Sequence, residues 1–172
     1  MSIKHSKVNR SHILSGQFFW IEKFLSDCTE AQKIAAYSHD IERAFRTEGK
    51  SIPEDYLDPE FLKNHQEKVA QIMVEFLRNN NAEEDLVTII IHLISKHEVG
   101  GDTEQNALVD SDSLSFFETN AEMFVKEKTP AEGKEKVKDK LDWMFNRIST
   151  EERKNLAREN YEKWSKELEK FR

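Results

Sequence analysis

The sequence predicts an all-α fold, and two observations support this prediction. Only five Gly and three Pro occur among the 172 residues, so few positions interrupt a helix. Apolar residues recur at spacings of three and four along the chain, which is the period of one helix face, and no segment shows the alternation that is typical of a strand. A chain of this length fits one domain that buries about two thirds of its unfolded surface. We therefore expect a single-domain helical bundle.

The first helix is expected over residues 11–26, after a polar start at residues 1–9. Ser11 is a suitable N-cap, and His12 and Gly16 lie one turn apart on a stripe that faces partly inward. Gly16 costs about 1 kcal/mol relative to Ala in a helix interior, which is tolerable if another backbone or a ligand approaches closely. Simple packing or a helix end is the alternative explanation.

The second helix is expected to begin near Glu30 and to carry the His39-Asp40 dipeptide in its second half. Thr29 followed three residues later by Gln32 has the spacing of a capping box. Neighbouring side chains on a helix point about 100° apart, so they converge on one atom only if it lies at the helix edge between them. A metal ion fits that position, because imidazole nitrogen and carboxylate oxygen are both ligands of first-row metals.

A long connection is expected over residues 47–59, which contain one Gly and two Pro among mostly polar residues. Connections of this length are often functional. The segment forms either a wall or lid over the dipeptide, with Lys50 and Tyr56 as candidate substrate contacts, or a passive crossover between helices.

Two further helices are expected over residues 59–78 and 83–97. His65 lies on the apolar face of the first of them, where a His is either a hydrogen-bonded core residue or a metal ligand. His92 and His97 lie five residues apart in the second, about 140° around the helix, so one ion is not expected to bind both. We assign His97 to the site, and His92 to the core or to a contact behind a metal ligand.

A fifth helix is expected from Asp102 through Asp112. Asp110 and Asp112 point to nearly opposite faces of it, so only one of them can readily bind an ion. We choose Asp112, and we expect Asp110 to cap, to pair with a cation or to hold a ligand His. Beyond this helix, residues 126–140 have the mixed Lys and Glu composition of a solvated helix face, and a last helix is expected over residues 150–172.

Composition argues against several classes of function. The 26 Lys and Arg against 33 Asp and Glu leave a net charge of −7, so no overall positive field attracts nucleic acid or anionic lipid, and we find no DNA-binding motif. The longest apolar run, residues 86–94, is far shorter than the ~20 residues of a membrane-spanning helix, and residues 1–20 lack the apolar core of a signal peptide. The single Cys28 excludes an intramolecular disulfide and suits a reducing compartment. We expect a cytoplasmic protein without a membrane partner.

The histidines and aspartates occur in an order that resembles the HD-domain superfamily of metal-dependent phosphohydrolases. The resemblance covers about residues 8–120, and Asp112-Ser113-Leu114 takes the place of the family's Asp-x-Leu element. A looser resemblance to an uncharacterised family of HD relatives spans the chain. The residues that match metal ligands of the superfamily are His12, His39, Asp40, His65, His97 and Asp112.

The resemblance implies an HD-like metal-binding domain over residues 1–125, with the helices of residues 126–172 packed on it. It also implies one or two divalent metal ions per chain, with Mn, Fe, Co, Ni, Zn or Mg as candidates. His65 and His97 are available for a second ion, which Asp40 would bridge to the first. The first ion would be bound by His12, His39, Asp40 and Asp112.

The activity that the resemblance implies is metal-assisted hydrolysis of a phosphoester, with a small phosphorylated substrate such as a nucleotide. Arg43 and Lys96 are candidates for binding phosphate charge, and Glu42 for orienting or deprotonating water. An alternative is a non-catalytic HD-fold module that binds metal or nucleotide in a regulatory role. A third interpretation treats the histidines as polar core residues without a ligand. The sequence leaves open the substrate, the metal, and whether the chain is a monomer or a homodimer.

Overall fold

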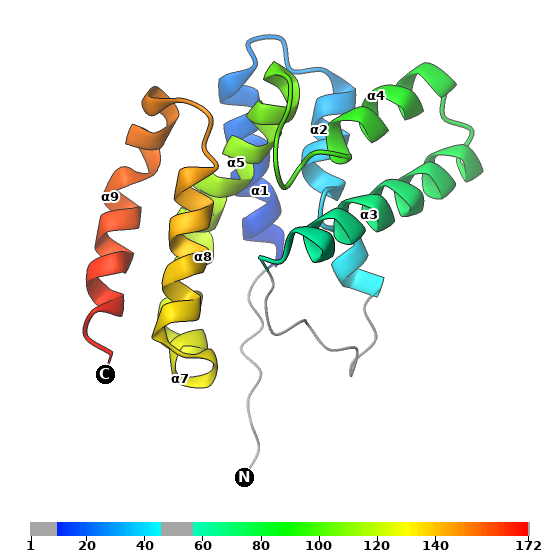
Figure 1. Ribbon diagram of the computed structural model, residues 1–172. Helices are drawn as coiled ribbons and strands as arrows, with labels where there is room; N and C mark the ends of the chain where they lie inside the picture. The colour runs from blue at the N-terminus through cyan, green and yellow to red at the C-terminus, as the bar shows by residue number, and fades with distance from the viewer. Residues whose placement is uncertain (1–9, 46–56, 172) are drawn as a thin grey trace.

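The structure is a computed structural model that describes residues 10–45 and 57–171, with side chains from residue 16 onward. Within these ranges the chain forms helices and no strand, so the predicted all-α class is confirmed. Helices α8 and α9 lie side by side at one end of the molecule and α3 and α4 at the other, with α1 and α5 between them (Figure 1). None of the helices in these ranges combines the length and apolar character that crossing a membrane requires.

The N-terminal part consists of α1 (Arg10–Phe24), α2 (Glu30–Ser38) and a short 3₁₀ helix, η1 (Ile41–Phe45). The predicted capping box is present, because the Gln32 backbone N–H donates to Thr29 Oγ1 at 3.3 Å and the Thr29 backbone N–H donates to Gln32 Oε1 at 2.8 Å. Helix α2 ends one residue before His39, so the prediction that the dipeptide lies within the second half of a helix was wrong. The dipeptide lies in the turn between α2 and η1.

The middle of the chain forms α3 (Pro59–Asn79), α4 (Glu84–Ile94) and α5 (Thr103–Thr119). Asp58 and Asp102 cap α3 and α5 through backbone N–H groups of the first turn, as their types at these positions predict. Helix α4 ends three residues earlier than predicted, so His97 lies in a turn beyond it rather than in the helix.

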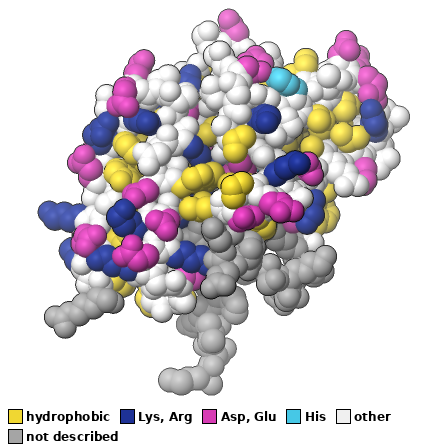
Figure 2. Space-filling model, in the orientation of Figure 1, with side chains coloured by type: hydrophobic (Ala, Val, Ile, Leu, Met, Phe, Trp, Pro, Cys, Tyr) yellow, Lys and Arg dark blue, Asp and Glu magenta, His cyan; other side chains and the backbone are white. Residues whose placement is uncertain are grey.

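The C-terminal part contains α6 (Ala121–Met123), a π-helical segment η2 (Phe124–Lys128), α7 (Thr129–Glu132), α8 (Lys134–Asn146) and α9 (Glu151–Leu168). Lysine and glutamate alternate over much of this part, and Figure 2 shows basic and acidic side chains interspersed on the face in view. This mixture agrees with the predicted solvated helix faces.

Two hydrophobic clusters meet along α1 and α5. On α1, Trp20 packs into the cluster of the C-terminal helices, whereas its neighbour Ile21 packs into the cluster of α2, α3 and α4. On α5, Leu114 belongs to the former cluster and Leu108 to the latter. The C-terminal helices therefore share their core with α1 and α5.

Helices α1 and α5 pack against each other at Gly16. A Cβ atom at this position would lie 2.8 Å from Ser115 Oγ, well inside an ordinary van der Waals contact. The nearest backbone atom of α5, Ser115 Cα, would lie 4.0 Å away, so the structure shows side-chain packing, which was the alternative explanation, rather than a close backbone approach.

Candidate metal centre

Four separate segments bring polar side chains to one buried place. Asp40 follows the end of α2, His65 lies in the second turn of α3, and His97 and Glu98 lie in the turn after α4. One ligand atom from each of these four residues lies within 4.8 Å of the other three. Ligand atoms that bind one ion through bonds of about 2.0–2.2 Å lie up to about 4.4 Å apart. The spacing in this group is close to that value, so the group can hold a metal ion.

Two histidines of this region are fixed in the same way by the ends of helices. The Nδ1 atom of His39 lies 2.9 Å from the carbonyl oxygen of Ala36, and Nδ1 of His97 lies 2.7 Å from the carbonyl oxygen of Ile94. A carbonyl oxygen can only accept, so each Nδ1 carries the proton and donates it. Each Nε2 atom therefore points inward as the remaining nitrogen.

These two inward nitrogens are buried without a hydrogen-bond partner in the described part of the chain. The residues are 2% and 1% exposed for His39 and His97, respectively. A buried polar atom without a partner costs free energy unless water or an ion satisfies it. A metal-bound histidine typically donates a hydrogen bond from one ring nitrogen and binds the ion through the other. The two histidines have this arrangement, so the donor set fits a metal ion.

Asp40 lies between the two halves of the centre. Its Oδ1 lies 3.1 Å from His65 Nε2, and its Oδ2 lies 3.7 Å from His39 Nε2. On the His39 side, Asp112 Oδ1 lies 3.4 Å from the same His39 nitrogen. The two oxygens of Asp40 thus face different groups of possible ligands, as a bridging carboxylate requires.

Glu98 is a member of the group that sequence reasoning missed. Its Oε1 lies 3.7 Å from His97 Nε2 and 3.8 Å from His65 Nε2. A signal for it was available, since His97-Glu98 repeats the pattern of His39-Asp40, a His followed by an acid at the end of an apolar segment.

Arg147 is the second residue that sequence reasoning missed, and it follows α8 directly. Its guanidinium bonds to the carboxylates of Glu98 and Asp112, and its side chain is only 7% exposed. No local motif marks it, because an Arg in a segment rich in charged residues has the composition of a solvated surface.

The charges of the centre shift the pKa values of its residues. Burial disfavours the charged form of His39, but the carboxylates of Asp40 and Asp112 outweigh burial and raise its pKa to about 9. Burial lowers the pKa of His97 to about 4, with only partial opposition from Glu98. His97 is therefore neutral at pH 7, which is the form that binds metal.

The carboxylates of the centre are ionised at neutral pH. Burial would raise the pKa of Asp112 and of Glu98, but the Arg147 guanidinium outweighs it and holds both pKa values below their ordinary range. For Asp40, the charges of Arg43 and His39 overcome burial and hold its pKa well below the usual value. Anionic oxygens are thus available beside the histidines.

The three predicted catalytic residues lie in different places. Glu42 Oε2 lies 3.0 Å from His65 Nδ1, on the side of the ring opposite Asp40, and Arg43 Nε lies 2.8 Å from Asp40 Oδ1. Lys96 is exposed, and no described contact joins it to the centre. The structure therefore brings Glu42 and Arg43 to the centre and does not bring Lys96 there.

Several other sequence-based assignments can be compared with the structure. His92 is exposed and lies 2.6 Å from Asp102, so its assignment to the core or to a ligand contact was wrong. Asp110 pairs with a cation, because Arg153 Nη1 lies 2.6 Å from its Oδ2. This pairing was one of the predicted alternatives for Asp110. The side chain of His12 and the residues Lys50 and Tyr56 lie outside the described part of the structure.

Lys140 of α8 adds a further cation near the carboxylates. Its Nζ lies 4.4 Å from the centre of the Trp143 ring. Burial, together with the positive charges of Arg147 and Arg43, lowers its pKa to about 8, although Glu98 opposes the shift. An additional anion would relieve this repulsion between cations.

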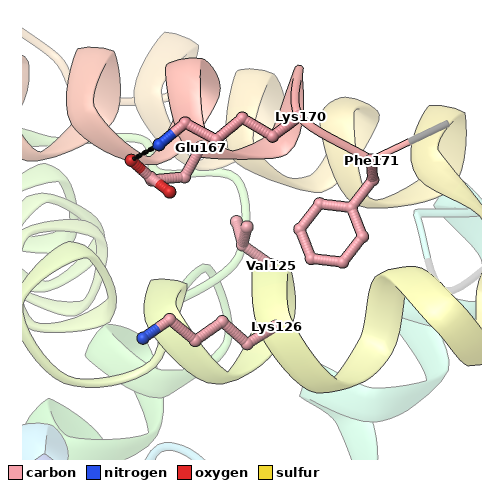
Figure 3. Close-up of a pocket in the computed structure, with 5 residues that line it drawn as sticks. All are labelled: Val125, Lys126, Glu167, Lys170 and Phe171. Atoms are coloured by element: carbon pink, nitrogen blue, oxygen red, sulfur yellow. Dashed lines mark hydrogen bonds and ion pairs between the residues drawn. The ribbon is translucent and has the colours of Figure 1, made fainter.

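A separate cavity of about 290 Å³ lies away from the centre, between η2 and the end of α9 (Figure 3). Its lining contains the Lys170–Glu167 ion pair, a second lysine and two apolar side chains, and it includes no histidine. The lining residues are Val125, Lys126, Glu167, Lys170 and Phe171. This cavity therefore does not belong to the candidate metal centre.

The fold and the centre together define an all-helical protein with a buried group of histidines and carboxylates that can hold a metal ion. The chain belongs to the family described as "Domain of unknown function (DUF4202)", which matches residues 11–171. Comparison with curated proteins and with solved structures finds no match.

Proposed function

We propose that this protein is a metal-dependent phosphohydrolase of the HD-domain type that acts on a nucleotide or another small phosphoester. The observation that carries the proposal is the pair of buried Nε2 atoms of His39 and His97, neither of which forms a hydrogen bond with the described residues. Three carboxylates, of Asp40, Glu98 and Asp112, lie within 4 Å of histidine Nε2 atoms of the same centre. A purely structural cluster would be expected to satisfy these nitrogens.

The residues divide into two sets of metal ligands that share Asp40. His39, Asp40 and Asp112 belong to one set, to which the resemblance adds His12. The other set contains Asp40 with the three residues that the turn after α4 and helix α3 contribute, namely His65, His97 and Glu98. Bound divalent metal would polarise a phosphoryl oxygen and lower the pKa of a coordinated water.

The protein side chains around these ligands orient them and bind the substrate's charge. Glu42 accepts the Nδ1 proton of His65 and so directs its Nε2 toward the ion. Arg43 and Lys140 supply positive charge for the phosphate oxygens. We assign this role to Lys140 in place of the exposed Lys96 because Lys140 and Arg147 contact the same Trp143 ring, and Arg147 binds the carboxylates of the centre.

The proposal is tested by metal content and phosphoester turnover of the purified chain. We expect wild-type protein to retain a divalent transition metal and to hydrolyse a generic phosphoester or a member of a nucleotide panel. His39→Gln and His97→Gln should each lose at least one ion and fall by two or more orders of magnitude in activity, because each loses a ligand atom. Elemental analysis and a phosphate-release assay provide the two measurements.

His92→Gln is the matched control, because the His92 side chain is exposed and bonds to Asp102, which is not a member of the centre. It should keep wild-type metal content and activity. Wild-type metal content in both inner variants would show that the site is misplaced. Metal binding without turnover of any phosphoester would reject the hydrolase and leave a non-catalytic binding module.

A further inference from the structure

We propose that Arg147 is a positioning residue that holds the outer oxygens of Asp112 and Glu98, so that their inner oxygens face the two sets of metal ligands. The inference rests on the proposed metal centre. It assigns a role in that centre to the C-terminal helices, where the sequence shows no catalytic pattern.

Most hydrogen-bond donors of the Arg147 guanidinium bond to residues near the centre. Nη1 donates to Glu98 Oε2 at 2.8 Å and lies 3.4 Å from the Glu98 carbonyl oxygen, while Nη2 donates to Asp112 Oδ2. Nε donates to Ser113 Oγ at 2.8 Å, and the guanidinium carbon lies 4.3 Å from the centre of the Trp143 ring. Stacking on one face and bonds along the edge leave the guanidinium a single orientation.

The other oxygen of each carboxylate faces a histidine. Asp112 Oδ1 lies 3.4 Å from His39 Nε2, and Glu98 Oε1 lies 3.7 Å from His97 Nε2. In each carboxylate, one oxygen therefore binds Arg147 and the other faces the Nε2 atom of His39 or His97. Neither of these nitrogens has a hydrogen-bond partner in the described part of the chain. One residue thus orients an oxygen in each of the two ligand sets.

An arginine suits this role better than a lysine. Its planar group presents several donors in a fixed geometry and can bond to two carboxylates at once, whereas an ammonium is a point charge on a flexible chain. It also offsets the repulsion between Glu98 and Asp112, which are both ionised in the same buried region.

The position of Arg147 is itself fixed by α5. Asp110, two residues before Asp112, is fully buried and accepts from the Ser149 backbone N–H at 2.7 Å and from Ser149 Oγ at 2.6 Å. These bonds tie the turn between α8 and α9 to the helix that supplies Asp112. Arg147 lies in this turn and therefore keeps a constant position relative to the centre.

The experiment is a calorimetric titration of the metal-free, full-length protein with Mn²⁺. Arg147→Gln should weaken Mn²⁺ binding about 10- to 100-fold, because the carboxylate ligands lose the partner that orients them. Arg147→Lys should give a smaller loss of affinity, since it keeps the positive charge but not the planar group that bonds to two carboxylates at once. Circular dichroism of each variant establishes that it is folded, and Arg147→Lys serves as the test if Arg147→Gln does not fold.

Arg153→Gln is the matched control for packing. It breaks the other buried arginine–carboxylate pair between α5 and the α8–α9 region without touching the centre, so it should lower the melting temperature while leaving Mn²⁺ affinity within about twofold. Wild-type Mn²⁺ affinity in the folded Arg147 variants would overturn the inference, as would an equal loss of affinity in Arg153→Gln. If wild-type protein bound no Mn²⁺ or other divalent metal, the metal centre itself would be rejected, and the role of Arg147 with it.

Discussion

His39 and His97 make the same local contact and yet differ in charge. Both donate from Nδ1 to the carbonyl oxygen three residues earlier. His39 is additionally close to Asp40 and Asp112, whose negative charges raise its pKa to about 9 against the effect of burial, whereas burial dominates at His97 and lowers its pKa to about 4. At pH 7 the metal-free centre therefore contains one charged and one neutral histidine.

This difference predicts a pH dependence of stability in the metal-free protein. The folded-state pKa of His39 lies above the value of 6.5 for an unperturbed His, so its charge stabilises the fold fully below pH 6.5, and this contribution is lost as the pH rises through about 9. The contribution is on the order of 3 kcal/mol at most. Urea unfolding of the metal-free protein between pH 6 and 9.5 should show the loss.

The contribution of His39 is isolated by comparison with His39→Gln, which has no titrating ring. The difference in unfolding free energy between the two proteins should shrink as the pH rises. A difference that stays constant or grows over this range would show that His39 is not charged in the metal-free fold.

At the scale of secondary-structure elements, α1 and α5 pack against each other and contribute residues to both hydrophobic clusters. This packing depends on Gly16, where even a Cβ atom would meet Ser115 Oγ. Gly16→Val should therefore destabilise the protein by about 1–3 kcal/mol through overpacking. Thermal or urea unfolding measures the change.

The combination of Gly16→Ala with Ser115→Ala separates overpacking from a general intolerance of substitution. Removing the hydroxyl makes room for the new methyl group, and Ala is favoured over Gly in a helix interior by about 1 kcal/mol. The double variant should thus be at least as stable as Gly16→Ala alone. Unchanged stability in Gly16→Val would mean that the helices are not held at this distance.

At the scale of the whole molecule, the candidate ligands come from segments that only the complete fold brings together. A metal ion that binds the folded chain and not the unfolded one stabilises the fold, by about 2.7 kcal/mol when free metal is 100 times its Kd. Removing the metal with a chelator should therefore lower the melting temperature by about 5–10 °C for a domain of this size. Differential scanning calorimetry with and without chelator gives the shift.

The same measurement on two variants tests whether the shift comes from the proposed centre. His97→Gln should show a smaller shift on chelation than the wild type, because it loses a ligand of one of the two sets, whereas His92→Gln should show the wild-type shift. An equal shift in both variants would assign the stabilising metal to a different site.

The sequence by itself determined the features that depend on neighbouring residues. The helical period, the capping box at Thr29 and the caps at Asp58 and Asp102 are local, so they predict the all-α class and most helix starts. Helix ends were predicted less well, because packing and the turn geometry at His39 and His97 decide where a helix stops.

Part of the candidate centre also follows from the sequence. Asp40, His65 and His97 were predicted as ligands and lie together, and His39 and Asp112 lie beside them. The order of these residues along the chain carried the resemblance to a metal-binding superfamily, and that resemblance supplied the prediction.

Only the tertiary structure decided the remaining members and contacts of the centre. Glu98 and Arg147 are 49 residues apart and meet because α5 binds the turn between α8 and α9. Likewise, Lys96 lies exposed in the turn after α4, whereas Lys140 of α8 packs against the Trp143 ring, the same ring that the Arg147 guanidinium contacts. Composition and period describe each helix separately, whereas the packing of one helix on another determines which charged side chains are buried together.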